Sequence, residues 1–257
     1  MVHMLEGKVA LITGGSSGIG RSAGVLFAKA GARVVVAARR VDDGEETVKI
    51  IREAGGEARF VRTDVSQAAA VQALVKMCVE WYGRLDYAVN NAGIEGSIVP
   101  LVEYTDDDWD AIIDINLKGV WLCMKAEIVE MQKNGGGAIV NISSIGGLIG
   151  FPRMGPYVAT KHGIIGLTKT AALEYAAHNI RVNVICPGLI DTPMADRFVD
   201  RMQAGGIDAE QFVLSLTPLK RRGTPEEIAE AAVWLCSDAA SYITGHAMVI
   251  DGGFMAI

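Results

Sequence analysis

The sequence predicts an α/β fold in which a doubly wound parallel sheet of seven strands is covered by helices on both faces. Seven short runs rich in β-branched residues alternate with longer segments of helical length, an order typical of strand and helix units wound around one sheet. The runs are nearly continuous in apolar residues, as expected for strands buried on both faces. Glycine follows three helical segments, at Gly31, Gly55 and Gly83, where a left-handed residue ends a helix.

We expect the strands at residues 9–13, 33–37, 58–61, 87–90, 138–142, 181–185 and 247–250. The helical segments that alternate most clearly with them cover residues 19–30, 68–82 and 157–178, and a further helix starts near Pro225. The chain has 257 residues, half of them hydrophobic, which is enough for one large core. We therefore predict a single domain that spans residues 1–257.

One stretch, residues 188–217, departs from the alternation and predicts a small helical substrate lid. It follows the carboxyl end of the sixth strand, the side on which such sheets bind ligands. Its apolar side chains either wall a substrate pocket or form the core of two short helices. They surround Gly205 and Gly206, and they are Met194, Phe198, Met202, Phe212 and Leu214.

Charge and cysteine content exclude several classes of protein. The formal net charge is -6, a poor match for nucleic acid phosphates or anionic lipid, which need clustered cations. The sequence contains no run of about 20 apolar residues, so we expect no membrane span. The four cysteines form no CxxC pair, so we expect neither a metal site nor a disulfide framework. These features favour a cytoplasmic protein that acts on a small molecule.

A glycine-rich turn between the first strand and the first helix predicts a phosphate-binding site. Backbone amides and the positive end of a helix dipole favour a pyrophosphate there, and glycine lets it approach the amides. Since the chain has 30 glycines, such a cluster also arises by chance, and the spacing is not GxGxxG. The candidate residues are Gly14, Ser16, Ser17, Gly18, Ile19 and Gly20.

The end of the second strand predicts which dinucleotide is bound. Ala38 stands where a carboxylate would bind the adenosine ribose, and Arg39 and Arg40 follow it. Guanidinium groups complement a 2′-phosphate, so we expect NADP(H) in preference to NAD(H). Two alternatives remain open: the arginines are a solvated pair at a helix start, or Asp42 or Asp43 reaches the ribose of NAD.

Tyr157 and Lys161 stand four residues apart at the start of a predicted helix, which places them on one face. Bringing a phenol from a pKa of about 10 to near 7 requires roughly 4 kcal/mol. An ammonium about 4 Å away at an effective dielectric of about 20 supplies energy of that order. The pair is thus a feasible acid/base unit, although the spacing alone also occurs by chance.

Three further polar groups have a functional and a structural interpretation. Ser144 follows the fifth strand and either hydrogen-bonds a reacting oxygen or bonds its own turn. Asn116 is either an inward polar group on a water chain or an exposed helix residue. Residues 90–93, Asn-Asn-Ala-Gly, border the cofactor or form the turn after the fourth strand.

Together these motifs resemble the short-chain dehydrogenase/reductase family over residues 5–257, which implies a Rossmann-like fold. The motifs are TGxxxGxG at 13–20, Asp64 and Val65, NNAG at 90–93, Asn116, Ser144, YxxxK at 157–161, Pro187 and Gly188, and Asp-Gly-Gly at 251–253. The resemblance implies that Tyr157 donates or accepts the proton and that Lys161 binds the nicotinamide ribose and lowers the tyrosine pKa. It also implies that Ser144 polarises the carbonyl and that Asn116 holds a water of the proton relay.

The resemblance implies the remaining cofactor contacts as well. Asp64 and Val65 would border the adenine, Asn90 the ribose on the adenosine side, and Ile190 and Thr192 the nicotinamide amide. The other residues expected at the cofactor are Asn91, Ala92, Gly93, Pro187 and Gly188.

We therefore predict an oxidoreductase that transfers a hydride between NADP(H) and a secondary alcohol or ketone. The alternatives within the family are an NAD-dependent alcohol or sugar dehydrogenase and a 3-ketoacyl thioester reductase. Outside it, a catalytically silent dinucleotide sensor has no use for the tyrosine and lysine pair, and a methyltransferase is disfavoured by Arg39 and Arg40.

The substrate pocket is expected to be largely apolar and suited to a cyclic, aromatic or medium-chain compound. Its candidate residues, besides the lid, are Ile94, Ile145, Leu148, Phe151 and Met154. Glu95 and Arg153 either add polarity at its mouth or are solvated loop charges, and we favour solvated charges. A homotetramer is expected from the resemblance, with the apolar carboxyl end around Ile250 and residues 254–257 as an interface.

Overall fold

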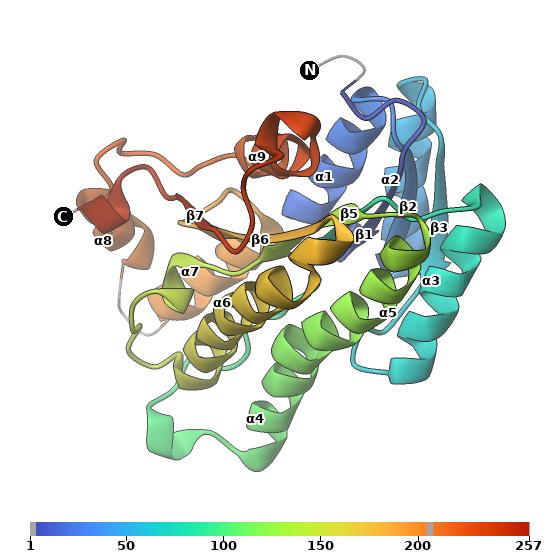
Figure 1. Ribbon diagram of the computed structural model, residues 1–257. Helices are drawn as coiled ribbons and strands as arrows, with labels where there is room; N and C mark the ends of the chain where they lie inside the picture. The colour runs from blue at the N-terminus through green and yellow to red at the C-terminus, as the bar shows by residue number, and fades with distance from the viewer. Residues whose placement is uncertain (1–3, 205–207, 257) are drawn as a thin grey trace.

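A computed structural model describes residues 4–204 and 208–256 of the protein. Its centre is a sheet of seven parallel strands in the order β3-β2-β1-β4-β5-β6-β7 (Figure 1). The strands are β1 Val9–Thr13, β2 Arg33–Ala38, β3 Ala58–Arg62, β4 Tyr87–Asn90, β5 Gly137–Ile142, β6 Ile180–Pro187 and β7 Ala247–Ile250. The predicted doubly wound sheet is confirmed, with strand ends moved by two residues at most. Gly205, Gly206 and Ile257 lie outside the described residues.

Helices cover both faces of the sheet (Figure 1). One face carries α1 Gly18–Lys29, α2 Val41–Glu53 and α9 Pro225–Cys236, and the other carries α3 Ala68–Tyr82, α5 Gly119–Lys133 and α6 Gly155–Tyr175. Because side chains alternate along a strand, Ile12 packs in the cluster of Phe27, whereas Leu11 packs with Ile164 in the opposite cluster. Each strand therefore contributes to two separate cores.

Local sequence explains where the helices begin and end. Gly83 ends α3 in the left-handed conformation, with φ of 77°, and Gly31 and Gly55 also have positive φ, as predicted. Thr224 begins α9 with a capping box, in which its hydroxyl accepts from the Glu227 amide and the Glu227 carboxylate accepts from the Thr224 amide. These signals satisfy backbone groups that the helix itself leaves unpaired.

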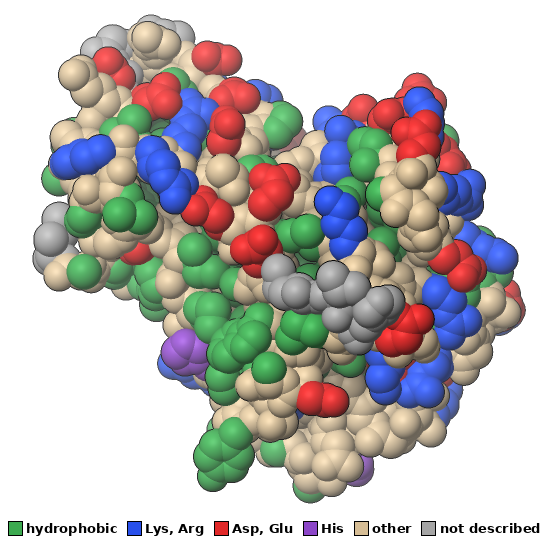
Figure 2. Space-filling view, turned by 90° about the horizontal axis from the view of Figure 1, so that it is seen from above, with side chains coloured by type: hydrophobic (Ala, Val, Ile, Leu, Met, Phe, Trp, Pro, Cys, Tyr) green, Lys and Arg blue, Asp and Glu red, His purple; other side chains and the backbone are tan. Residues whose placement is uncertain are grey.

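Several short elements complete the chain. Helix α4 Asp106–Ile112 runs directly into a π-helical segment, Ile113–Lys118, which precedes α5. Single 3₁₀ turns lie at Leu101–Glu103, Ile145–Gly147, Ala176–His178, Asp238–Ala240 and Phe254–Ala256. Among residues 4–204 and 208–256, no helix is both long and apolar enough to cross a membrane. Acidic and basic side chains are interspersed on the face shown in Figure 2.

The lid segment contains two short helices, α7 Pro193–Ala204 and α8 Ala209–Leu216. Arg222 holds them to the loop after β6, since its guanidinium pairs with Asp196 of α7 at 2.7 Å and Glu210 of α8 at 2.7 Å, and with Asp191 at 3.4 Å. Its side chain is only 16% exposed. One arginine thus links both lid helices to the sheet.

The order of the strands reverses between β1 and β4, and such folds have a ligand crevice at the carboxyl ends of the strands at that point. Thr13 ends β1, and its hydroxyl accepts from the amides of Asn91 and Ala92, which follow β4. The two turns that flank the crevice are therefore joined by one side chain.

Candidate active site

The glycine-rich turn is closed by contacts that leave no room for side chains. Gly14 has φ of 65°, and a Cβ there would lie 2.7 Å from the Asn91 amide nitrogen. At Gly20 a Cβ would collide with the carbonyl oxygen of Gly14. The Asn91 side chain donates to the carbonyls of Thr13 and Gly14, both at 3.2 Å. The predicted contact residue Asn91 therefore also fixes the shape of the turn.

Helix α1 opens toward this turn with the features of an anion site. Its N-cap, Ser17, makes no capping hydrogen bond with its side chain, and the first turn contains no acidic residue. The amides of Gly18, Ile19 and Gly20 begin the helix and so have no carbonyl one turn earlier. Amides at the positive end of a helix bind phosphate well, so the turn fits the pyrophosphate of a dinucleotide.

Arg40 reaches across to the same turn. Its Nη2 donates to the hydroxyls of Ser17 at 3.2 Å and Ser16 at 3.4 Å, and its Nε pairs with Asp43 at 2.6 Å. Arg39 is exposed beside it, and Ala38 is buried at the strand end. The Asp43 carboxylate is thus bound to an arginine, which weighs against the alternative in which it holds a ribose.

The neighbouring strand ends supply the other walls of the crevice. Asp64 accepts from the amide and hydroxyl of Ser66, and Val65 packs in one apolar cluster with Ala92. Thr192, in the loop after β6, lies against Gly18, where a Cβ would be 3.0 Å from its Cγ2. The turn after β1 and the loop after β6 therefore meet across the crevice.

The loop after β6 is itself tied to the last strand. The amide of Gly188 donates to Ile250 at 2.9 Å directly after Pro187, and Ile190 is buried and bridges to Gly223. The four predicted residues Pro187, Gly188, Ile190 and Thr192 thus lie along one short stretch at the crevice.

Tyr157 and Lys161 lie in the first two turns of α6. The Lys161 side chain is buried, and its ammonium donates to the carbonyl of Ile142 at 3.0 Å. The ammonium lies 5.4 Å from the centre of the Tyr157 ring. Burial lowers the pKa of Lys161 to about 8. The two side chains are neighbours, as their spacing predicts.

The predicted direction of the tyrosine shift is wrong for the protein alone. Part of the Tyr157 side chain remains accessible, yet burial among protein atoms raises its pKa, and the nearby Glu95 carboxylate adds to the rise. A hydrogen bond with Ser144 lowers the pKa of the phenol, but less strongly than burial raises it. Lys161 is not among the groups that lower the pKa of the phenol, and its ammonium donates to a backbone carbonyl.

Ser144 bonds its own turn, as its structural interpretation predicts, and it also lies within reach of the tyrosine. It caps the 3₁₀ turn after β5 by accepting from the Gly146 amide at 3.0 Å, and it also bonds Tyr157. Its neighbour Ser143 donates to the carbonyl of Lys161 at 2.8 Å. The end of β5 is thereby fixed to the helix that carries the tyrosine.

Asn116 is an inward polar group and not an exposed one. It is fully buried in the π-helical segment, and its amide makes two hydrogen bonds of 2.8 Å to the backbone of Ile94, one as donor and one as acceptor. A π-helical turn is often found at functional sites. Here it aims Asn116 at the loop after NNAG, and a Cβ on Gly93 would lie 3.3 Å from its oxygen.

Asn90 does not border a ribose with its side chain. Its amide is buried and donates to Glu127 at 2.9 Å and to Asn141 at 3.1 Å. Glu127 lies in α5 and is fully buried, and burial raises its pKa to about 8. Sequence reasoning missed Glu127, although it falls on the apolar stripe of α5 with Val120, Met124 and Met131.

The interpretation of Glu95 as a solvated loop charge is wrong. Its carboxylate is buried, and Arg197 of α7 holds it with Nε at 2.7 Å and Nη2 at 3.2 Å. Arg153 is exposed as expected and has φ of 68°, and its carbonyl accepts from the Tyr104 hydroxyl at 2.9 Å. The two charged residues thus have different environments.

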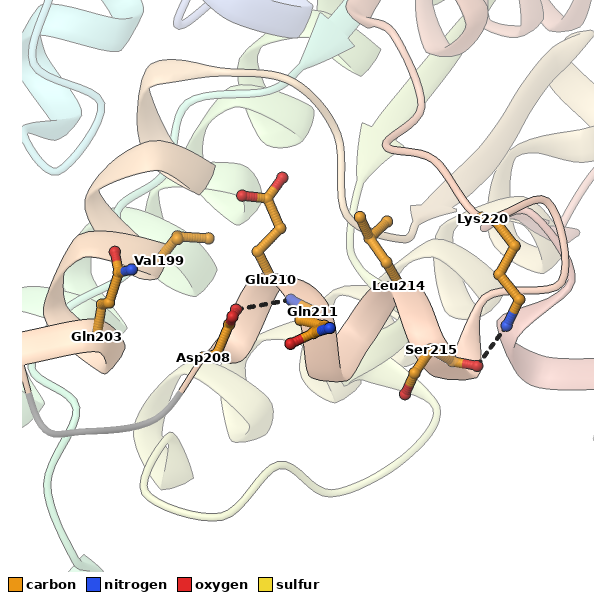
Figure 3. Close-up of a pocket in the computed structure, with 8 residues that line it drawn as sticks. All are labelled: Val199, Gln203, Asp208, Glu210, Gln211, Leu214, Ser215 and Lys220. Carbon is orange, nitrogen blue, oxygen red and sulfur yellow. Dashed lines mark hydrogen bonds between the residues drawn. The ribbon is translucent and has the colours of Figure 1, made fainter.

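The apolar pocket candidates are unequally placed. Ile145 and Met154 are buried, whereas Leu148 is 36% exposed and Phe212 is 62% exposed. A separate cavity of about 510 Å³ lies between the lid helices, and Figure 3 shows its lining. It is lined by Val199, Gln203, Asp208, Glu210, Gln211, Leu214, Ser215 and Lys220. Leu214 therefore faces this cavity, which contains none of the predicted catalytic residues.

Within the described part of the chain, no group of three or more histidine, cysteine, aspartate or glutamate residues could hold a metal ion. All four cysteines are buried and unpaired.

A phosphate-binding turn, a tyrosine and lysine pair and a serine at adjoining strand ends define a dinucleotide-dependent oxidoreductase. The family model described as "Enoyl-(Acyl carrier protein) reductase" matches residues 14–255. The chain is 45% identical to the short chain dehydrogenase/reductase astE of Aspergillus oryzae, over 98% of this chain and 97% of the relative. It is 43% identical to a 2,5-dichloro-2,5-cyclohexadiene-1,4-diol dehydrogenase of Sphingobium indicum, over 98% and 99% of the two chains. The crystal structure of levodione reductase superposes with a TM-score of 0.95 at 37% identity, covering 98% of this chain and 99% of that one.

The protein belongs to the short-chain dehydrogenase/reductase family. It is an NAD(P)-dependent enzyme of the alcohol dehydrogenase and carbonyl reductase type, with a small molecule as substrate.

Proposed function

We propose that the protein interconverts a secondary alcohol and a ketone with NADP(H), and that the substrate is a cyclic, aromatic or medium-chain lipophilic compound. The observation that carries the proposal is the meeting of Ser144, Tyr157 and Lys161 at the strand ends, beside an open helix terminus fit for a pyrophosphate. A protein that only senses the cofactor has no use for that arrangement.

The nicotinamide ring supplies or accepts the hydride when it is bound. Tyr157 gives its phenolic proton to the carbonyl oxygen during reduction and takes it back during oxidation, while the Ser144 hydroxyl donates to the same oxygen. Lys161 bonds the nicotinamide ribose, and Asn116 holds a water through which the proton is replaced. An ammonium has three N–H donors, so Lys161 can bond the ribose either by turning away from the Ile142 carbonyl or by using another donor.

The remaining cofactor-binding residues follow the walls of the crevice. The turn at Gly14, Ser16, Ser17, Gly18, Ile19 and Gly20 holds the pyrophosphate. Asp64, Val65, Ala92 and Gly93 line the adenosine side, with Asn91 fixing the turn, and Pro187, Gly188, Ile190 and Thr192 line the nicotinamide side.

Tyr157→Phe tests the central role. The variant loses the proton donor but keeps the ring, so we expect reduction to slow by about 10³-fold while the fluorescence of bound NADPH is retained. The assay follows nicotinamide absorbance with a panel of ketones. Retention of most turnover refutes the assignment.

We infer a preference for NADP(H) from the arginines after β2. Ala38 provides no carboxylate to bond a ribose, Asp43 is paired with Arg40, and Arg40 already reaches Ser16 and Ser17. Arg39→Ala and Arg40→Ala are expected to raise the KM for NADPH about tenfold and to leave that for NADH unchanged. Equal losses with both cofactors contradict the preference.

The relatives support the substrate class. One is named for a cyclohexadiene diol and a similar structure is a levodione reductase. Ile145, which follows Ser144, and Met154, which precedes α6, are buried apolar side chains. A kinetic panel of cyclic ketones, aromatic ketones, sugars and a 3-ketoacyl thioester separates these substrates. A thioester turned over fastest overturns the assignment.

We also propose that residues 1–257 act as one domain, with 188–217 as its lid, and that the protein is a cytoplasmic homotetramer. The unpaired cysteines are compatible with a reducing compartment. Sedimentation at equilibrium tests the tetramer, and a monomer of 27.3 kDa contradicts it.

A further inference from the structure

We propose that the ion pair between Glu95 and Arg197 is a positioning device that fixes α7 beside the catalytic tyrosine and neutralises a carboxylate there. The inference rests on the proposed function, because its kinetic readouts need a working enzyme. Both residues lie outside the residues that touch the reacting atoms.

The contacts join two distant segments of the chain. Glu95 lies five residues after β4, and Arg197 lies in the first half of α7, 102 residues later. The guanidinium meets both carboxylate oxygens, at 2.7 and 3.2 Å. Arg201, one turn further on, donates to the carbonyl of Gly96 at 2.7 Å and lies 3.7 Å from Glu95. Two arginines of one helix therefore bind the same loop.

This loop after β4 is itself bonded to Asn116 of the candidate active site. Ile94, next to Glu95, has both backbone groups bonded by the buried Asn116 amide. The Glu95 side chain is 8% exposed, so its carboxylate is largely desolvated. The Arg197 side chain is 47% exposed, so the pair stands at the edge of the interior, and its bidentate geometry gains more than a single exposed contact does. The position of α7 is thus set through Glu95 by the segment that carries Asn116.

The arginines also lie next to a row of apolar side chains on α7. Met194, Phe198 and Met202 recur every four residues and are partly buried. Phe198 follows Arg197, Met202 follows Arg201, and Met194 lies one turn before Phe198. Because the arginines are held by the loop, this row is held in register beside them. Loss of the pair is expected to weaken substrate binding through that row.

Charge gives the pair a second effect. Ser144, which is hydrogen-bonded to the Tyr157 phenol, and Glu95 act on its ionisation, and the Lys161 ammonium lies 5.4 Å from the ring centre. Glu95 opposes ionisation of the phenol, and Arg197 holds the pKa of Glu95 below its usual range, so the carboxylate stays charged. Arg197 therefore offsets the field that Glu95 exerts on the tyrosine.

The two partners can be separated by the direction of a pH shift. In Arg197→Gln the Glu95 carboxylate loses its bidentate partner and keeps only Arg201 at 3.7 Å, so the ionisation of Tyr157 seen in kcat/KM for alcohol oxidation moves to higher pH. In Glu95→Gln the charge is absent and the same limb moves to lower pH. Both single variants and the double variant are expected to raise the substrate KM about tenfold. In the double variant the limb returns near that of the wild type.

Arg221→Gln is the matched control, since Arg221 also holds a glutamate, Glu227, with two hydrogen bonds but lies in an exposed position. It is expected to leave KM and the pH limb unchanged. Shifts of the same sign in Arg197→Gln and Glu95→Gln, or no shift in either, overturn the proposal.

Hydrogen exchange of the amides in residues 193–203, measured without substrate, separates this inference from the proposed function. Exchange is expected to be faster in Glu95→Gln and Arg197→Gln than in the wild type and in Arg221→Gln. Wild-type protein that turns over no ketone refutes the proposed function, while exchange still decides whether the pair holds α7. Unchanged exchange refutes the positioning role even when the enzyme is active.

Discussion

The buried Glu127 makes the free energy of unfolding depend on pH, and we expect Glu127→Gln to remove this dependence. Its carboxyl is fully buried in α5, accepts from Asn90 at 2.9 Å, and leaves its second oxygen and the Asn90 carbonyl oxygen without partners. A neutral acid has a proton to donate to such an acceptor, whereas a carboxylate has none. Folding therefore favours the protonated form.

The size of the effect follows from the pKa of Glu127, which burial raises from 4.5 to about 8. At 1.36 kcal/mol per pH unit this amounts to about 5 kcal/mol. Between pH 4.5 and 8 the folded protein binds a proton that the unfolded chain has released, so the free energy of unfolding falls as pH rises through this window. Below pH 4.5 this contribution is constant, and above pH 8 the full cost is present.

The glutamine side chain of Glu127→Gln is neutral at every pH. It can accept from the Asn90 amide nitrogen and donate to the unpaired Asn90 side-chain oxygen. Relative to the wild type, we expect its free energy of unfolding to increase by about 3 kcal/mol between pH 5.5 and 8. That corresponds to a difference of roughly 10 °C in Tm. The measurement is urea and thermal unfolding followed by circular dichroism, at several pH values, without cofactor.

Glu130→Gln is the control, because Glu130 lies on the same helix but pairs at the surface with Lys133. We expect it to differ from the wild type by less than about 1 kcal/mol at every pH. If the gap between Glu127→Gln and the wild type is the same at pH 5.5 and pH 8, the carboxyl is not held neutral by burial, and the reasoning fails.

Four further outcomes are expected. Gly20→Ala brings a Cβ against the Gly14 carbonyl and is expected to weaken NADPH binding at least tenfold in a fluorescence titration. In the control Gly166→Ala the added Cβ has open space around it, so binding is kept and stability increases by about 0.5 kcal/mol. Because burial lowers the pKa of Lys161 to about 8, kcat/KM for reduction falls as pH rises through 8 and the ammonium loses its proton. Lys161→Met is expected to lose that limb along with most activity; an unchanged pH profile contradicts the assignment. Thr224→Ala removes a capping box and costs about 1 kcal/mol in urea unfolding, and no loss shows that α9 is held by packing alone.

The sheet was predictable because its signal is local. Each strand is a short β-branched run, and the glycines that end helices have the positive φ that makes glycine favourable there. The TGxxxGxG turn and the YxxxK pair were predictable for the same reason, since their geometry is set within eight residues or fewer. Motif spacing therefore predicted which turns and strand ends adjoin.

What the sequence did not predict depends on long-range contacts. Glu95 was interpreted as solvated because Arg197, its partner, is 102 residues away. In the protein alone, burial raises the pKa of Tyr157, and the spacing of the YxxxK pair revealed neither this burial nor the bond from Lys161 to Ile142. The π-helical turn at Asn116 has no local signal that we identified. Glu127 was detectable, because a carboxylate on an apolar helical stripe predicts a buried acid.

Arg222 has a consequence for how this enzyme can change its specificity. It anchors α7 and α8 through Asp196 and Glu210, near the first residue of each helix, and the hold consists of charges and not of apolar packing. Side chains further along the helices, such as Phe198 and Met202, can then be exchanged for larger or smaller ones while the anchor keeps its partners. On the proposal that the lid walls the substrate pocket, single substitutions there change the shape of the wall and leave its attachment intact.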